Sequence, residues 1–121
     1  MAKAKTGVLL VNLGTPDSPS VPHVRKYLRE FLMDKRVIDI PFISRWLLVN
    51  LIIAPFRAPK SAKVYQELWE DRGSPLMFHG IDLAEKLRVR LGSDYVVSLG
   101  MRYQSPTIAG GMEKLMAENV R

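Results

Sequence analysis

Few residues in this chain have the types and spacing that could do chemistry, and the clearest candidates would bind an anion. Arg57, Lys60, Tyr65 and Ser74 follow a strongly apolar segment and combine two cations with two hydroxyl groups. Such groups at the mouth of an apolar cleft can bind a carboxylate. The sequence therefore favours an anion site, although the same residues could be an exposed Arg and Lys, a half-buried Tyr and a turn Ser.

Side chains suited to acid–base, nucleophilic or metal chemistry are poorly represented. The chain has no cysteine, and its two histidines, His23 and His79, are not spaced as a pair of metal ligands. We expect both to be exposed or structural residues near helix starts. The phosphate-binding patterns GxGxxG and GxxxxGK[ST] do not occur, which argues against a nucleotide site. We expect no catalytic residue, metal ligand or bound cofactor in these 121 residues.

Composition and charge bound the class of protein. The 121 residues are enough for one domain, and a formal charge of +6 favours anionic partners. The chain lacks a basic run interleaved with aromatic residues, so nucleic acid is the weakest candidate partner. A lipid surface or a carboxylated or phosphorylated small molecule fits better, and a solvated basic surface without a partner is the alternative. No signal peptide is recognisable, and the longest apolar stretch is too short to span a membrane. We expect a cytoplasmic protein, with peripheral membrane contact left open.

The apolar run Val8–Val11 predicts a strand. The run has no polar alternation, which is typical of a parallel strand buried on both faces. It stops where Gly14 permits a turn and Pro16 cannot donate to a ladder. Ligands in open α/β sheets bind just past the carboxyl ends of strands. The loop 13–15 is therefore a candidate ligand site, with an ordinary strand exit as the alternative.

The remaining elements complete an α/β pattern. Tyr95–Met101 predicts a second buried strand. Helical spacing, caps and turn residues predict helices over 20–32, 42–56, from about Lys60 to a loop at 71–75, over about 78–91 and over about 107–119. This order favours a doubly wound parallel sheet, with the loops 13–16, 73–75 and 101–105 on one side of it. Because the last helix precedes an expected strand, the chain resembles the opening portion of a larger protein.

The segment Phe42–Phe56 is apolar on nearly all sides, interrupted by Arg45 and Asn50. A helix of this kind must be covered by a core, a ligand or a lipid surface. Flanking arginines and Trp46 suit a helix that lies at a membrane surface or forms one wall of an apolar cleft. A plain core helix is the alternative.

Several motifs recur in one order along the chain: Gly7–Pro16, Val24–Leu28, Phe31–Leu32 with Arg36–Ile38, Ala54–Lys60, Tyr65, Trp69, Gly73–Leu76 and Met101–Tyr103. In this order and spacing they resemble the amino-terminal third of the ferrochelatases, enzymes that insert Fe(II) into a porphyrin to make haem. The resemblance implies the first, incomplete domain of a chelatase-like fold of two doubly wound domains, with the porphyrin between them. It covers residues 1–121 and includes an apolar lip at about 42–60.

The resemblance also implies roles for individual residues. Leu13 would face the macrocycle, Arg57, Tyr65 and Ser74 would approach the porphyrin edge and its propionates, and Arg102 and Tyr103 would line the inner cleft. The lip that admits porphyrin and touches the membrane would include Trp46, Leu47, Leu51, Ile52 and Phe56. The histidine and carboxylate that handle protons and metal belong to the family's second half, so Fe(II) is a substrate of the whole enzyme and this part alone should be inactive.

Two departures from the family pattern matter. Leu13 stands where members acting on coproporphyrin often carry Tyr, which favours protoporphyrin IX as the substrate. Gln104 stands where Gly is common, so the loop after the second strand is less certain. The alternative to an enzyme part is a non-catalytic module that binds a porphyrin or a membrane surface with the same apolar segment.

Overall fold

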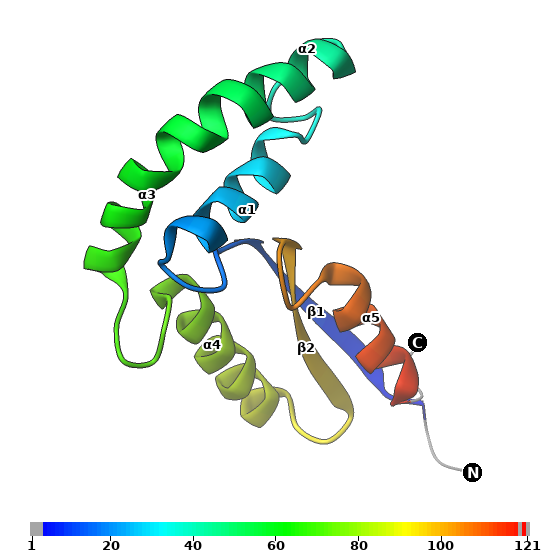
Figure 1. Cartoon of the computed structure of the whole chain (residues 1–121). Helices are drawn as coiled ribbons and strands as arrows, with labels where there is room; N and C mark the ends of the chain where they lie inside the picture. The colour runs from blue at the N-terminus through cyan, green and yellow to red at the C-terminus, as the bar shows by residue number, and fades with distance from the viewer. Residues whose placement is uncertain (1–3, 119, 121) are drawn as a thin grey trace. The chain divides into compact units, whose positions relative to one another are not determined.

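The computed structural model describes residues 4–118 and 120, and the chain divides into two compact units. Unit 1 comprises the described residues of Met1–Gly14 and Leu76–Arg121, and unit 2 comprises Thr15–Pro75. The chain therefore leaves unit 1 after its first strand and returns to it at the start of a later helix (Figure 1).

Unit 1 is built on two parallel strands, β1 (Thr6–Gly14) and β2 (Tyr95–Tyr103). Their register runs from Thr6 opposite Tyr95 to Gly14 opposite Tyr103. Both predicted strands are confirmed, and each is longer than its apolar run because pairing continues into the flanking residues. A mixed α/β chain with a parallel sheet agrees with a partial chelatase-like domain.

Two helices cover the faces of this sheet, α4 (Pro75–Leu91) and α5 (Ile108–Ala117) (Figure 1). Successive strand residues point to opposite faces. Accordingly the side chain of Leu99 lies against Gly80 of α4, whereas the hydroxyl of Ser98 lies near Gly111 of α5. Helix α4 begins at Pro75, three residues before the predicted start, because proline suits the first helical turn. Helix α5 ends at Ala117; the predicted end, Asn119, lies outside the described residues.

Strand β1 is less buried than its sequence predicted. Val11 and Leu13 are exposed, and the preceding apolar residues are only partly covered. The reason is that α5 packs chiefly on β2, whose Val97 and Met101 are buried. Within this chain the prediction of a first strand buried on both faces is wrong.

Unit 2 is helical. Helix α1 (Val21–Leu32) is capped by the Ser20 hydroxyl, which accepts from the His23 amide at 3.4 Å, as the sequence predicted. After a connector, α2 (Phe42–Leu47), the π-helical segment η1 (Leu48–Ile53) and α3 (Ala54–Leu68) run on without a break in helical backbone. Figure 1 shows α1 lying alongside this long helix, and α1 packs on both η1 and α3.

The predicted break near Pro59 is wrong, because α3 continues through it. Pro55 lies just after the π-helical segment η1, whose hydrogen bonding differs from that of an α-helix, and the exposed Pro59 lies one turn later. Ala54, Ala58 and Ala62 are buried at four-residue spacing. A stripe of small residues lets α3 approach its neighbours closely along its whole length, so tertiary packing overrides the local preference to stop.

Candidate ligand-binding site

The carboxyl ends of β1 and β2 place three of the predicted site residues together in unit 1. Gly14 pairs with Tyr103, so the loops that follow the two strands leave the same end of the sheet. Leu13 is exposed and its amide donates to the Asn12 side chain at 2.8 Å. The exposed Arg102 guanidinium lies 5.1 Å from the ring centre of Tyr103, which is itself buried. This end of the sheet offers an apolar side chain and a cation held against an aromatic ring.

The loop after β2 explains one departure from the family pattern. Gln104 is buried and has a backbone φ of 64°. That left-handed conformation favours glycine, since a side chain there is strained. Gln104 adopts this backbone with its side chain buried in unit 1.

In unit 2, two hydroxyl groups meet inside the protein. The Thr15 hydroxyl donates to Ser74 Oγ at 2.8 Å, although the residues are 59 positions apart. Thr15 belongs to the loop after β1 and Ser74 to the 73–75 turn. The structure therefore brings parts of the predicted loops 13–16 and 73–75 into contact.

Tyr65 lies in a small aromatic cluster. Its ring meets that of Tyr27 edge-on at 6.3 Å, and Tyr27 stacks on Phe31 at 6.1 Å. Burial raises the pKa of the Tyr65 phenol above its ordinary value, and a hydrogen bond from Tyr27 offsets part of that rise. Tyr65 is therefore a neutral hydroxyl at physiological pH, able to donate as well as accept a hydrogen bond.

A groove of about 570 Å³ lies along one face of η1 and α3. It combines apolar side chains with two cations and one hydroxyl: Ile52, Ile53, Phe56, Arg57, Lys60, Ser61 and Val64. Positions 52, 56, 60 and 64 are four residues apart and share a helical face. The groove therefore joins the predicted lip residues Ile52 and Phe56 to the predicted anion-binding Arg57.

The lip is exposed rather than covered by a core. Trp46, Leu47, Leu51 and Ile52 are all exposed, and Phe56 keeps 74% of its surface. Within this chain the reading of the segment as a plain core helix is therefore wrong. Among residues 4–118 and 120, no helix has both the length and the apolar character that crossing a bilayer would require.

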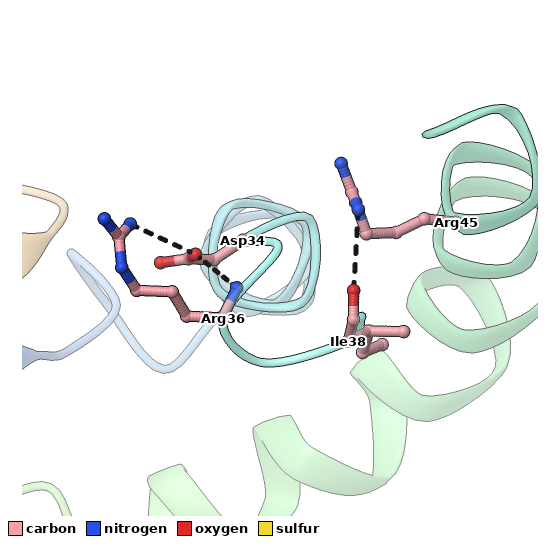
Figure 2. Close-up of polar contacts among 4 residues, drawn as sticks. All are labelled: Asp34, Arg36, Ile38 and Arg45. Carbon is pink, nitrogen blue, oxygen red and sulfur yellow. Dashed lines mark hydrogen bonds and ion pairs between the residues drawn. The ribbon is translucent and has the colours of Figure 1, made fainter. Parts of the chain in front are cut away.

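Arg45 does not flank the lip as a surface charge. It is 8% exposed, and its Nη1 donates to the Ile40 carbonyl at 2.9 Å. The same nitrogen donates to the Ile38 carbonyl at 3.5 Å (Figure 2). On the same connector, the exposed Arg36 lies 3.8 Å from the Asp34 carboxylate (Figure 2). Arg45 holds the connector to α2, so it does not supply the surface charge that the sequence suggested for it.

The sequence prediction of site residues missed Tyr27, whose ring meets that of Tyr65. It included Thr15 and Lys60 but not their contacts: Thr15 bonds to Ser74, and Lys60 lines the groove beside Arg57. The three-residue spacing of Arg57 and Lys60 on a helix could have indicated a shared face, whereas no local signal pairs Thr15 with Ser74. Within the described part of the chain, His, Asp and Glu side chains nowhere gather in a group of three that could hold a metal ion.

Comparison with known proteins accounts for this combination of features. The family model for ferrochelatase matches residues 5–121. A ferrochelatase of Coxiella burnetii (strain Dugway 5J108-111) is 52% identical over 117 residues, which cover 97% of this chain and 33% of that protein. A ferrochelatase of Legionella pneumophila (strain Corby) is 50% identical over 111 residues, or 92% of this chain and 34% of that protein. The chain thus spans about a third of the length of these curated relatives, and it belongs to the ferrochelatase family.

Proposed function

We propose that this chain is the amino-terminal part of an enzyme that inserts Fe(II) into protoporphyrin IX, the last step of haem biosynthesis. The part described here supplies a porphyrin-binding wall and an apolar lip. The missing carboxyl-terminal half of the same protein supplies the groups that accept the pyrrole protons and bind the metal. In this proposal the isolated chain binds porphyrin weakly and does not turn over.

The observation that carries the proposal is the groove on η1 and α3. A porphyrin is a flat apolar disc with carboxylates on one edge, so it needs apolar walls and a few cations or hydroxyls beside them. The groove places Ile52 and Phe56 next to Arg57 and Lys60 on one helical face. Guanidinium and ammonium groups beside apolar surface bind carboxylates more strongly than isolated surface charges do.

The same proposal assigns roles to the remaining predicted residues. Tyr65 and Ser74 are hydroxyl donors to the propionates, and Leu13, Arg102 and Tyr103 of unit 1 contact the porphyrin ring. Metal insertion also requires removal of two pyrrole protons, which needs a base positioned at the ring. None of the roles assigned to this chain is that base, so its contribution is to bind and orient the substrate.

A titration of the full-length protein with protoporphyrin IX, followed in the Soret band, tests the groove. The double variant Arg57→Met with Lys60→Met should raise the Kd about tenfold, since about 1.4 kcal/mol of carboxylate binding is lost. Lys26→Met with Arg29→Met removes the same charge from exposed positions of α1 and should leave the Kd unchanged. Equal weakening by both pairs would mean that net charge, and not the groove, attracts the porphyrin, and would overturn the proposal.

A second candidate function is a non-catalytic module that binds a lipid surface. The exposed apolar lip beside Arg57 and Lys60 favours it, because apolar side chains enter the headgroup region while cations meet anionic lipids. For the enzyme, the same surface would give peripheral attachment at the cytoplasmic face of a membrane. Both versions predict binding to anionic vesicles.

Co-sedimentation with phosphatidylglycerol vesicles tests the lip, and porphyrin titration in the Soret band separates the two versions. Phe56→Ser should reduce vesicle binding, whereas Val89→Ser in unit 1, where the valine is equally exposed, should not. Vesicle binding without any Soret change on porphyrin addition would favour the module. Porphyrin binding with or without vesicle binding would favour the enzyme part.

A further inference from the structure

We propose that Thr15 is a positioning residue that aims the Ser74 hydroxyl proton at a carboxylate of the bound substrate. This inference rests on the proposed role of Ser74 as a propionate donor and deepens it. It assigns a purpose to a buried hydrogen bond that porphyrin binding by itself does not require.

The hydrogen bond joins two rigid pieces of unit 2. Thr15 is 4% exposed and Ser74 is 7% exposed, and their oxygens are 2.8 Å apart. Ser74 follows Gly73, whose backbone φ is 103° and whose amide and carbonyl both bond to Glu70, at 2.8 Å and 3.0 Å. Pro75 then restricts the backbone on the other side of Ser74. The turn thus fixes the position of Ser74 Oγ, and that oxygen accepts a hydrogen bond from the Thr15 hydroxyl.

The direction of the bond determines what Ser74 can still do. A serine hydroxyl has one proton to donate and two lone pairs to accept with. With the Thr15 hydroxyl as donor to Ser74 Oγ, one lone pair of that oxygen is occupied and the Ser74 proton is available to another acceptor. Accepting a bond also polarises a hydroxyl, which strengthens the bond that it donates. A carboxylate oxygen on the substrate is the acceptor that gains most from this arrangement.

A purely structural bond between two loops would behave differently. It would affect stability but would not separate porphyrin affinity from turnover, and it would not distinguish a carboxylate from its ester. Thr15→Val removes the hydroxyl while keeping the branched shape, and Thr15→Ser keeps the hydroxyl while losing the methyl group. Comparing these two variants isolates the hydrogen bond from the packing.

The test measures Fe(II) insertion by the full-length enzyme with protoporphyrin IX and, in parallel, binding of the porphyrin dimethyl ester. Thr15→Val should raise the KM for protoporphyrin about threefold with kcat unchanged, and Thr15→Ser should restore it. Ester binding should not respond to Thr15→Val. In a Ser74→Ala background, Thr15→Val should have no further effect on KM, because the hydroxyl that it positions is gone.

The outcomes separate this inference from the function on which it rests. If Ser74→Ala itself leaves the KM unchanged, Ser74 is not a propionate donor and the proposed role of that residue fails. If Ser74→Ala raises the KM but Thr15→Val does not, or if Thr15→Ser fails to restore it, the positioning role is overturned. Should Thr15→Val not fold, Thr15→Ala compared with Thr15→Ser gives the same contrast with a smaller side chain.

Discussion

The two units use their polar and apolar surface in opposite ways. In unit 1, a cavity of about 630 Å³ beside β2 is rimmed by both signs of charge, with Glu85 and Arg88 on α4, Lys114 on α5 and Glu118 just after α5. In unit 2, the groove on η1 and α3 carries only cations among its charged lining residues, and large apolar side chains lie exposed beside it.

This difference separates scaffold from binding surface. Mixed charges around a cavity give no net attraction for an ion, whereas two cations on apolar surface favour an anionic amphiphile. Unit 1 holds its strands through close backbone approach and buried side chains. Unit 2 buries a stripe of small residues on α3 and adds hydrogen bonds from a few buried polar groups, but it leaves large apolar side chains of the lip exposed. The predictions below test whether the units really differ in this way.

The largest effect should come from Gly14, at the end of β1. A Cβ there would lie 2.2 Å from the Tyr103 carbonyl oxygen, and the backbone φ of 118° is already unfavourable for any side chain. Gly14→Ala should therefore cost about 4 kcal/mol of unfolding free energy, combining backbone strain with displacement of β2. Urea unfolding of the protein measures it.

Gly92 is the matched control for this prediction. Its φ is 84°, but a Cβ there meets nothing within 4 Å. Gly92→Ala should cost only the conformational part, about 1 kcal/mol. Equal costs at the two glycines would show that β1 and β2 separate easily at this end, contrary to a closely packed unit 1.

Met101 and Phe56 compare the two units directly. Met101 is 1% exposed in β2, so Met101→Ala should cost about 3 kcal/mol through lost burial and a cavity. Phe56→Ala removes a larger but exposed side chain from unit 2 and should change stability by less than about 0.5 kcal/mol. Differential scanning calorimetry of both variants checks the contrast. A large loss at Phe56 would mean that another part of the full-length protein covers the lip, and would argue against a membrane or ligand surface.

Much of the fold was predictable because its signals are local. Apolar runs specified both strands, and serine at position 20 is a residue type that commonly caps a helix, as it does for α1. The predicted helix start after Pro59 was wrong because α3 is held together by tertiary packing, which is not a local signal. The buried stripe of Ala54, Ala58 and Ala62 keeps α3 intact, and whether such a stripe is buried depends on where α1 lies.

The site was less predictable because its contacts are long-range. The bond between Thr15 and Ser74 spans 59 positions, and nothing near either residue specifies the other. Arg45 looked like a surface charge because its neighbours are apolar, and only the path of the preceding connector turns the carbonyls of Ile38 and Ile40 toward it. The groove was partly foreseen, since Arg57 and Phe56 were identified as separate features and the helix simply brings them to one face.

Arg45 should contribute more than its neighbour on the same connector. Arg45→Met leaves two carbonyls without their charged donor and should cost about 2 kcal/mol in unfolding free energy. The Arg36 side chain is 83% exposed and lies 3.8 Å from the Asp34 carboxylate, so its charge stays solvated and Arg36→Met should cost less than about 0.5 kcal/mol. Chemical denaturation of the two variants gives the comparison. Equal, small losses would mean that the connector is not held to α2 by Arg45.

The smallest effect is the pH dependence contributed by Tyr65. Burial raises the pKa of its phenol in the folded protein above the ordinary value of 10.0, so the unfolded chain loses this proton first as pH rises. The stabilisation from Tyr65 is therefore complete below pH 10.0 and is lost as pH rises through the higher folded pKa. Tyr65→Phe should flatten the decline of unfolding free energy above that pH.

Removing the Tyr27 hydroxyl should shift the pKa of Tyr65 in a known direction. Its hydrogen bond lowers the pKa of Tyr65 and so opposes burial. Tyr27→Phe should raise the Tyr65 pKa further. Ultraviolet titration measures it: the curve of the double variant Tyr27→Phe with Tyr65→Phe is subtracted from that of Tyr27→Phe, which leaves the titration of Tyr65. An unchanged or lowered pKa would mean that water, and not Tyr27, stabilises the phenolate. Tyr65 would then face solvent, and unit 2 would lack the ordered hydroxyl that a propionate site requires there.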